Sequence, residues 1–458
     1  MTSATTVGRV FDPAGPEHRP DPHPLFHRMR EQAPVHRHVS PSGRAFWYLT
    51  RYADVQRALL HPDLGRELDR LPPELAAVHR RWDRDPLAMV RRNMFNLDPP
   101  DHTRLRRLMA PAFGPRTVAA LERRVHQVVG ELAGGLAAGA ETGAETGGEA
   151  EVEVDLIEAL ALPLPIMVVA ELVGFPAADL PRLRRWSDAM LRGRDAAQVR
   201  RAGLEFVAYV NERIDERRAR PDTYTGERQA GPDADGRRAG PGTDDDGRPG
   251  GAGEDLLSRL VRAERDGAGI SHEELVSSVF QLLLAGDETT VNLIGNGVLE
   301  LLRHPDQLDR LRARPEMIGS MVEEAMRFNG PVGHSRPLYA LADVRFGDAV
   351  IPRGDIVLPV LLAANRDPAV FPRPDVFDIG RDPNRHLGFG HGIHFCLGAA
   401  LARLQARAAI GALVRRFPGM ALAADPAGLE WTPDLFLHGV RRLPLLLRQR
   451  PPVKGSRR

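Results

Sequence analysis

The sequence predicts a mainly α-helical protein with small β-sheets. Apolar residues recur at helical spacing through most of the 458 residues, a pattern typical of amphipathic and buried helices. Short apolar runs separated by turn residues, which indicate β-strands, gather in residues 336–360, RPLYALADVRFGDAVIPRGDIVLPV. An apolar content of 42% and a charged content of 27% are ordinary for a globular protein, so the chain can build a large core.

Charge and cysteine content restrict the function classes. The formal net charge is +1, so we expect no nucleic-acid partner. Cys396 is the only cysteine, which excludes an internal disulfide framework and fits a reducing cytoplasm. The N-terminus lacks the apolar core of a signal peptide, and prolines and glutamates interrupt the most apolar segment, residues 156–175. We therefore expect a cytoplasmic protein with no membrane insertion.

Two segments look like insertions. Residues 139–151, GAETGAETGGEAE, lack apolar periodicity and are expected to form a surface loop. Residues 221–253 are so rich in Gly, Asp, Pro and Arg that they cannot bury a face, and we expect them to be disordered. Because a helical pattern resumes at Asp255, the second segment is interpreted as a long loop between two helices of one domain.

The best-defined helix begins after Gly269. Ser271 and Glu274 form a capping box, and Ile270 and Leu275 occupy the positions of a hydrophobic staple. No proline follows until Pro305. At ~1.5 Å per residue, this helix would be on the order of 45 Å long and would cross a large domain.

The middle of this helix carries the unusual run AGDETT. Ala285 and Thr289 are four residues apart and share a face, and Glu288 lies beside them. A small residue and a hydroxyl on one face would let a bulky flat group pack against the helix. The Thr289 hydroxyl could also bond back to the carbonyl of Ala285. An ordinary helix kink with satisfied polar groups explains this segment equally well.

A second pair of interest is Glu324 and Arg327 in MVEEAMRFNGP. A short helix between Pro315 and Pro331 makes the two side chains neighbours. Taken alone, such a pair is usually a solvated surface pair that contributes about a few tenths of a kcal/mol.

The third pattern is FGHGIHFCLG, residues 389–398, which contains Cys396. The glycine spacing does not fit a dinucleotide-binding loop, and no acidic residue follows at the right distance. A zinc site made of His391, His394 and Cys396 is conceivable, but structural zinc normally takes four ligands. A third reading makes Cys396 a thiolate ligand of haem iron, with glycines that let the backbone approach a flat macrocycle and a following helix that favours the anion. A lone cysteine is more often an inert buried residue.

These motifs occur together and in order. FGHGIHFCLG resembles the haem-binding signature F-G-x-G-x-H-x-C-x-G of the cytochrome P-450 superfamily, AGDETT resembles A-G-x-[DE]-T-T, and Glu324 with Arg327 resembles E-x-x-R. Residues 364–381 and 98–108 are similar to other stretches of that family. The resemblance extends over nearly the whole chain, in the style of the soluble bacterial members. It implies a single P-450 domain over residues 1–458, a helical prism with a long central helix over the haem.

The resemblance implies a haem b cofactor with Cys396 as the proximal thiolate ligand. By motif position, four residues would bind the two haem propionates: His102, Arg106, Arg336 and His394. Ala285 and Phe389 would lie against the macrocycle. Ordinary surface charge is the alternative for each of the four polar residues.

The resemblance also assigns the acid and alcohol on the distal side. Glu288 and Thr289 would deliver protons to bound dioxygen, with Thr289 coupling electron use to product and Glu288 connecting it to solvent. Glu324, Arg327 and Arg381 match the family's structural triad and are not expected to be catalytic.

Electrons would come from NAD(P)H through separate redox proteins, because no flavin or iron-sulfur segment is recognised in this sequence. The resemblance implies a ferredoxin with its ferredoxin reductase. A local basic patch for docking could consist of Arg104, Arg107, Arg403 and Arg407. Solvated helix faces are the alternative for each of them.

The implied activity is that of a haem-thiolate monooxygenase, which inserts one oxygen atom of O2 into a largely apolar small molecule by hydroxylation or epoxidation. By similarity, the substrate is a polyketide, macrolide-like or other specialised metabolite of antibiotic biosynthesis. Five segments would determine substrate specificity: residues 71–94, 191–207, 332–335 and 435–438 and the helix face near Leu283. Another oxidation, such as oxidative coupling or desaturation, and a haem-binding protein without turnover remain alternatives.

Overall fold

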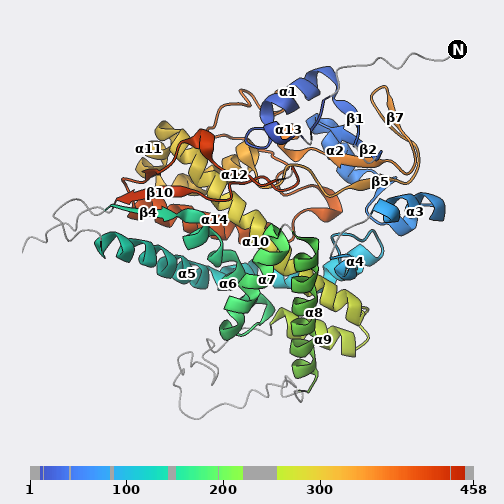
Figure 1. Ribbon diagram of the computed structural model, residues 1–458, viewed down its shortest axis with the longest axis horizontal. Coiled ribbons are helices and arrows are strands. Elements are labelled where there is room, and N and C mark those ends of the chain that lie inside the picture. The colour runs from blue at the N-terminus through green and yellow to red at the C-terminus, as the bar shows by residue number, and fades with distance from the viewer. Residues whose placement is uncertain are drawn as a thin grey trace, which may run out of the picture.

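The computed structural model describes residues 11–448 except 14, 41–42, 83–86, 143–150, 194, 220–254 and 434. Within them the fold is mainly helical with small sheets, as predicted from the sequence (Figure 1). The α-helices are α1 (His23–Gln32), α2 (Tyr52–Leu60), α3 (Pro73–Trp82), α4 (Asp101–Met109), α5 (Pro115–Thr142), α6 (Pro163–Val173), α7 (Leu180–Arg192), α8 (Ala196–Ala219), α9 (Leu256–Arg265), α10 (His272–Arg303), α11 (Pro305–Ala313), α12 (Ile318–Asn329), α13 (Leu361–Ala364) and α14 (Ala399–Arg416).

The strands form three small sheets. They are β1 (Val35–Val39), β2 (Ala45–Leu49), β3 (Leu64–Gly65), β4 (Glu151–Asp155), β5 (Leu338–Ala340), β6 (Val344–Phe346), β7 (Ala349–Ile351), β8 (Ile356–Pro359), β9 (Ala421–Leu422) and β10 (Pro444–Arg448). A five-stranded sheet has the order β1-β2-β8-β5-β3, a three-stranded sheet the order β4-β10-β9, and β6 pairs with β7. The strands expected in residues 336–360 are confirmed as β5 to β8.

The five-stranded sheet combines segments that are far apart in the chain. β2 and β8 run parallel, with Tyr48 opposite Leu358, whereas the other pairs of this sheet are antiparallel. Figure 1 shows β1, β2 and β5 gathered with α1 and α2 at the upper right, while α5 to α9 lie below. The sheet therefore has a small apolar core of its own, which includes Trp47 and Val357.

Helix α10 runs through the main apolar core. That core joins side chains from α5, α6, α8, α9, α10, α12 and α14. The predicted capping box is confirmed, because the Ser271 hydroxyl accepts from the Glu274 N–H and the Glu274 carboxylate accepts from the Ser271 N–H. Ile270 and Leu275, the staple pair, are both buried. Helix α10 has 32 residues, which agrees with the length predicted for the central helix.

The first expected insertion is shorter than predicted. Helix α5 continues to Thr142, and β4 begins at Glu151, so both ends of segment 139–151 belong to regular elements. Residues 135–138, GLAA, continue the helix, and it extends one further turn through residues 139–142, GAET. Residues 143–150 lie outside the described part of the chain.

The second expected insertion, residues 221–253, lies outside the described residues. The helices on either side of it, α8 and α9, are as predicted, and they contact each other. Asp255 caps α9 by accepting from the Ser258 N–H, and its carboxylate also accepts from the Arg217 guanidinium of α8 at 3.3 and 3.4 Å. The single-domain organisation stays a prediction.

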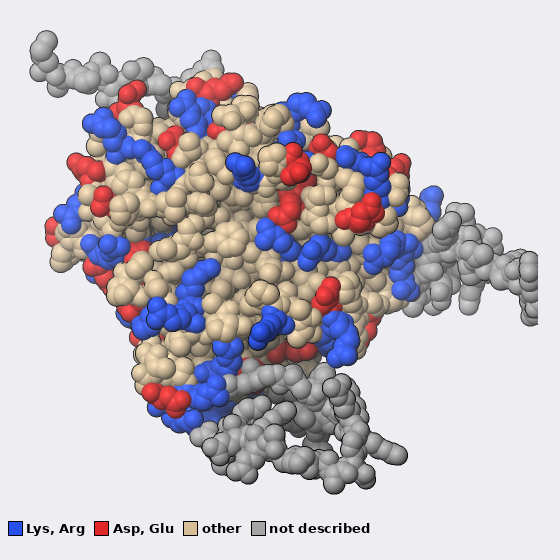
Figure 2. Space-filling model, turned by 180° about the vertical axis from the view of Figure 1, so that it is seen from behind, with Lys and Arg blue, Asp and Glu red and all other residues tan. Residues whose placement is uncertain are grey.

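The described surface carries both signs of charge. Figure 2 shows blue and red side chains intermingled over the face opposite to that of Figure 1, as expected for a net charge of +1. Among the described residues, no helix is long and apolar enough to cross a membrane.

Candidate functional site

The cysteine loop is held in shape by its own backbone. The Cys396 N–H donates to the Phe389 carbonyl oxygen at 2.8 Å, which closes the loop on itself. A 3-10 turn, η8 (Gly392–His394), lies inside it, and α14 begins three residues after the cysteine with Gly398 as its N-cap. The sequence prediction of a helix that starts just after the cysteine is therefore confirmed.

Packing inside the protein also restricts two of the loop glycines. Gly392 has a φ of +71°, and a Cβ there would lie 2.8 Å from Leu60 Cδ2 of α2. A Cβ on Gly388 would lie 2.7 Å from Met326 Cε of α12. The left-handed backbone therefore favours glycine at position 392, and a side chain at position 388 would have to displace the end of Met326. The sequence pattern had indicated only that glycines would let the backbone approach a flat ligand.

The Cys396 thiol sits among groups that partly favour its anion. Burial raises its pKa, while a hydrogen bond from the Gly398 backbone and the positive charges of Arg106 and Arg403 act in the opposite direction. The residue nevertheless keeps some accessible surface, as do its neighbours Leu397 and Gly398. A metal ion that coordinates such a thiol displaces its proton outright.

The structure does not support the zinc alternative. Among the described residues, no three His, Cys, Asp or Glu side chains come together as a metal site. The ring of His394 turns instead toward His102, and His391 lies near Gln56 of α2, with 3.5 Å between the two side-chain nitrogens. A zinc site made of His391, His394 and Cys396 is therefore not formed.

Helix α10 exposes a small patch in the middle of its otherwise buried length. Leu284, Ala285, Gly286 and Thr289 are partly accessible, whereas residues 274–280 and 290–301 are buried. The Thr289 hydroxyl donates to the Ala285 carbonyl oxygen at 2.8 Å, which confirms the predicted back-bond. This face thus offers a small side chain and a hydroxyl oxygen in the interior of the molecule.

Two buried carboxylates adjoin this patch. Asp287 is 2% exposed and Glu288 is 7% exposed. The Ser187 hydroxyl of α7 donates to Asp287, so the position of α7 is tied to the centre of α10. Glu288, the predicted acid, is therefore close to the accessible patch in sequence and shielded from bulk water.

Four positively charged or imidazole groups gather near the cysteine loop. The rings of His102 in α4 and His394 in the loop are 4.4 Å apart between centroids. Burial and then the Arg106 and Arg66 charges lower the pKa of His102 to about 4. Burial, and next the charges of Arg66, His102 and Arg106, lower the pKa of His394 as well. Three of the predicted propionate residues, His102, Arg106 and His394, are thus brought together.

Arg336 joins the same group through Arg66. Burial and the charge of Arg336 lower the pKa of Arg66, so the two guanidinium groups are close enough to repel each other. Sequence reasoning named Arg336 but missed Arg66, which belongs to no motif. The one signal for Arg66 would have been an arginine directly after a short strand, and this is too common to single it out.

The buried imidazole of His102 lacks a good partner. Neither of its ring nitrogens makes a hydrogen bond of normal geometry to another described residue, although the Ile393 backbone lies beside the ring. A buried polar group without a partner costs free energy, as do several cations in one place. Two carboxylates would relieve both conditions, and a haem carries two. The donor set therefore fits the propionates, and ordinary surface charge does not describe this cluster.

Phe389 lies inside the cysteine loop. It is 8% exposed, and the Arg403 guanidinium stacks on its ring, with the carbon Cζ 4.3 Å from the ring centroid. The Phe395 ring is 6.3 Å away between centroids. These contacts brace the loop from the side of α14.

The Glu324 and Arg327 pair is not the surface pair that its sequence spacing alone suggested. Both side chains are 0% exposed, and the guanidinium donates twice to the carboxylate at 2.8 Å. Arg381 donates to the same carboxylate at 3.1 and 3.2 Å, so the expected triad is formed. The remaining Arg327 protons go to the carbonyl oxygens of Asn365, Pro374 and Val376. The triad fixes the segment that leads into the cysteine loop.

Two of the four arginines in the expected basic patch are paired with carboxylates of the protein. Arg104 is bound to Asp101 and Glu274, with its shortest contact to Glu274 at 2.7 Å, and Arg403 donates to Glu323 at 2.6 and 2.7 Å. Arg107 and Arg407 are exposed. Arg407 donates from Nε to the Arg403 carbonyl oxygen at 3.2 Å, so Arg107 and Arg407 present exposed charge on this side without a carboxylate contact like those of Arg104 and Arg403.

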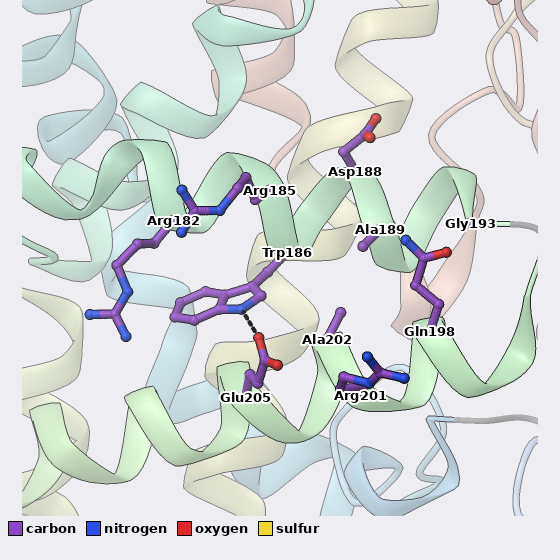
Figure 3. Close-up of a pocket in the computed structure, with 10 residues that line it drawn as sticks. All are labelled: Arg182, Arg185, Trp186, Asp188, Ala189, Gly193, Gln198, Arg201, Ala202 and Glu205. Carbon is purple, nitrogen blue, oxygen red and sulfur yellow. Dashed lines mark hydrogen bonds between the residues drawn. The ribbon is translucent and has the colours of Figure 1, made fainter.

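Two of the segments expected to choose the substrate are directly paired. Val332 and Leu437 form an antiparallel bridge, and the Gly333 N–H donates to the Phe436 carbonyl oxygen at 3.0 Å. A third segment, residues 191–207, contributes to a pocket of about 790 Å³ between α7 and α8. Figure 3 shows Trp186 between these helices, with its indole N–H donating to Glu205 at 2.9 Å. None of the predicted haem or catalytic residues lines this pocket.

Comparison with known proteins decides the family. The sequence profile described as cytochrome P-450 matches residues 171–421, more than half of the chain. The chain belongs to the cytochrome P-450 family.

The P-450 relatives extend over almost all of the chain. It is 40% identical to cytochrome P-450 107B1 of Saccharopolyspora erythraea over 93% of this chain and 95% of that protein. It is 38% identical to the cytochrome P-450 monooxygenase PikC of Streptomyces venezuelae, over 95% and 93% of the two chains. The solved structure of the bacillaene polyketide synthase cytochrome P-450 PksS of Bacillus subtilis has a TM-score of 0.80 and 33% identity, covering 96% of this chain and all of that one.

Membership in the family establishes the class of chemistry. This P-450 is a haem-binding monooxygenase that takes its electrons from separate redox proteins, as is standard for the family. The sequence predictions of fold, cofactor and enzyme class are thereby confirmed.

Proposed function

We propose that this P-450 inserts one oxygen atom of O2 into a largely apolar small molecule, by hydroxylation or epoxidation, in the biosynthesis of a polyketide-type specialised metabolite. The observation that carries the catalytic part is the cysteine loop. A thiol fixed by the loop backbone stands beside a cluster of cations that suits two carboxylates. The names of the relatives PikC, a monooxygenase, and PksS, of a polyketide synthase system, support the substrate class.

Cys396 is the proposed iron ligand. His102, Arg106, Arg336 and His394 are proposed to bind the haem propionates, and Ala285 and Phe389 to border the macrocycle. The haem, when bound, supplies the activation of O2 with electron donation from the thiolate. The protein keeps the sulfur in place through the Cys396 N–H bond to Phe389 and the start of α14.

Thr289 and Glu288 are proposed to deliver protons on the distal side of the haem, opposite Cys396. Because the Thr289 hydroxyl proton is committed to the Ala285 carbonyl, its oxygen is left to accept a hydrogen bond, for example from a water molecule. Glu288, buried next to it, can hold or release a proton close to that water. The alcohol therefore positions the proton carrier, and the carboxyl connects it to solvent.

A ferredoxin with its reductase is the proposed electron source, and the cytoplasm the proposed compartment. Arg106 in α4 and Arg403 in α14 both act on the charge of Cys396, so these helices approach the cysteine loop. Their exposed neighbours Arg107 and Arg407 would meet an acidic partner on that side.

The deciding experiment is the carbon monoxide difference spectrum of the reduced protein, with Cys396→Ser beside it. A strongly red-shifted Soret band in the wild type, lost in the variant, supports thiolate ligation. A band where histidine-ligated haems absorb, or absence of haem after reconstitution, would overturn the assignment of Cys396. Product analysis with candidate substrates then distinguishes oxygen insertion from coupling or desaturation.

A further inference from the structure

Arg66 is clamped beside the start of α4 without belonging to any recognised motif. Its backbone N–H donates to both carboxylate oxygens of Asp98, at 3.0 and 2.9 Å, and its Nη1 donates to the Phe95 carbonyl oxygen at 2.7 Å. The Asp98 carbonyl oxygen accepts in turn from the His102 N–H at 2.9 Å. Asp98 therefore joins the backbone of Arg66 to the helix that carries His102 and Arg106.

The guanidinium of Arg66 has an unmet hydrogen-bonding need. Its Nε is buried and has no hydrogen-bond partner in the described part of the chain. Nitrogen Nη1 is used for Phe95, and the Asp98 carboxylate is already occupied by backbone N–H groups of Arg66 and Glu67 and by the Arg70 guanidinium at 3.3 Å. A buried Arg N–H normally finds an acceptor, so an acceptor outside the protein chain is indicated.

The charge of Arg66 is also poorly balanced. Burial, and next the neighbouring Arg336, lower its pKa to about 9, and Asp98 offsets this only in part. The same charge acts on His102 and His394. A half-buried cation among other cations is unfavourable unless an anion joins them. Arg66, like His102, therefore lies where a bound anion would be stabilising.

We propose that Arg66 is a fifth member of the propionate-binding group and donates a charge-assisted hydrogen bond to one haem propionate. This inference rests on the haem site of the proposed function and adds to it a residue from outside the recognised motifs. A purely structural role, in which Arg66 only orders residues 95–98, is the competing explanation.

Haem exchange distinguishes the two roles. The apoprotein is reconstituted with haem b or with its dimethyl ester, whose propionates no longer carry charge, and haem loss to excess apomyoglobin is timed. With haem b, Arg66→Gln should lose the group roughly tenfold faster than the wild type, because a charge-assisted bond is removed. With the dimethyl ester, the two proteins should lose it at nearly equal rates.

Arg70→Gln is the matched control. Arg70 also pairs with Asp98, at 3.3 Å, but its side chain is 41% exposed. It should leave both loss rates unchanged. Arg66→Lys, which keeps the charge and loses the planar fork, should fall between the wild type and Arg66→Gln and guards against a folding defect in the latter.

Three results would overturn the inference: equal loss of haem b from Arg66→Gln and wild type, an equally large effect of Arg66→Gln on the ester, or an equal effect of Arg70→Gln. The reduced carbon monoxide spectrum is recorded on the same samples. A red-shifted Soret band in the wild type with unchanged loss rates would reject the role of Arg66 alone. Absence of that band in the wild type would reject the proposed haem site itself.

Discussion

The hydroxyl of Thr289 donates a hydrogen bond of 2.8 Å to the carbonyl oxygen of Ala285, one turn earlier in α10. The Ala285 carbonyl is the ordinary acceptor of the Thr289 N–H, so it serves two donors from one residue. Such back-bonding loosens the helix locally. It occurs where α10 keeps accessible surface, between two long buried stretches. The geometry of the proposed proton site is thus set within one helical turn.

We expect Thr289→Ala to retain haem and the fold but to waste electrons. Without the hydroxyl oxygen, the proton carrier beside Glu288 is no longer positioned, and reduced oxygen leaves as hydrogen peroxide. The product formed per NAD(P)H should fall by roughly tenfold or more, on the scale of a positioned acid–base group. Thr289→Ser, which keeps the hydroxyl, should recover most of it. An unchanged ratio of product to NAD(P)H in Thr289→Ala would contradict this role.

Removal of one partner from the buried pair of α12 should be severely destabilising. Glu324→Gln leaves the Arg327 charge buried without its carboxylate, and both side chains are 0% exposed. We expect a loss of about 3–5 kcal/mol in the free energy of unfolding. Urea unfolding followed by circular dichroism gives this value.

The control for Glu324→Gln is a surface pair with the same spacing. Arg312 and Asp309 are three residues apart at 2.9 Å, and the aspartate is 72% exposed. Asp309→Asn should cost less than about 1 kcal/mol. Equal effects of the two substitutions would show that burial does not decide the strength of the Glu324 pair.

Local signals in the sequence predicted the central helix well. The capping box at Ser271, the proline-free stretch to Pro305 and the back-bond of Thr289 all depend on residues within one or two turns of each other. The strands β5 to β8 were likewise predicted, because turn residues separate them. Properties that depend on neighbours along the chain can therefore be predicted from the amino-acid sequence alone.

Long-range packing could not be predicted in the same way. Arg327 is buried because it donates to carbonyl oxygens of Asn365, Pro374 and Val376, and spacing within α12 says nothing of these. Arg66 reaches the site through Asp98, thirty-two residues later in the chain. Gly392 packs against α2 and Gly388 against α12, and these contacts also join segments far apart in the chain. Only the family resemblance could anticipate the triad, and it did not anticipate Arg66.

Acid should weaken the N-terminus of α10 through Glu274. Burial alone would raise the pKa of Glu274, but hydrogen bonds from Arg104 and the Ser271 N–H outweigh it and lower the pKa to about 2, from an ordinary 4.5. The folded-state pKa lies below the unfolded one, so the stabilisation is complete above pH 4.5 and is lost as the pH falls toward 2.

Glu274→Gln tests this pH dependence. The variant should be less stable than the wild type at pH 6, and the difference in free energy of unfolding should shrink as the pH falls below 4.5. Urea unfolding at several pH values between about 6 and 3.5 measures it. Glu273→Gln, on the exposed side of the same turn, should match the wild type throughout. A constant difference for Glu274→Gln at every pH would contradict the assignment.

Docking of the redox partner should depend on the exposed arginines near the cysteine loop. Arg403 is held by Glu323 at 2.6 Å, whereas Arg107 and Arg407 are exposed. The double variant Arg107→Glu with Arg407→Glu reverses the local charge beside the cysteine loop. We expect the first-electron reduction by a ferredoxin to slow by roughly tenfold at low salt, since such charges mainly set the association rate. The defect should shrink as ionic strength rises, because exposed charges are screened within about 10 Å at 0.1 M salt.

Arg353→Glu is the control for this double variant. Arg353 is an exposed arginine in the turn between β7 and β8, and its substitution should leave the rate unchanged. Reduction by dithionite should be the same in all variants, and an equally slow dithionite reaction would place the defect in the haem site and not in docking.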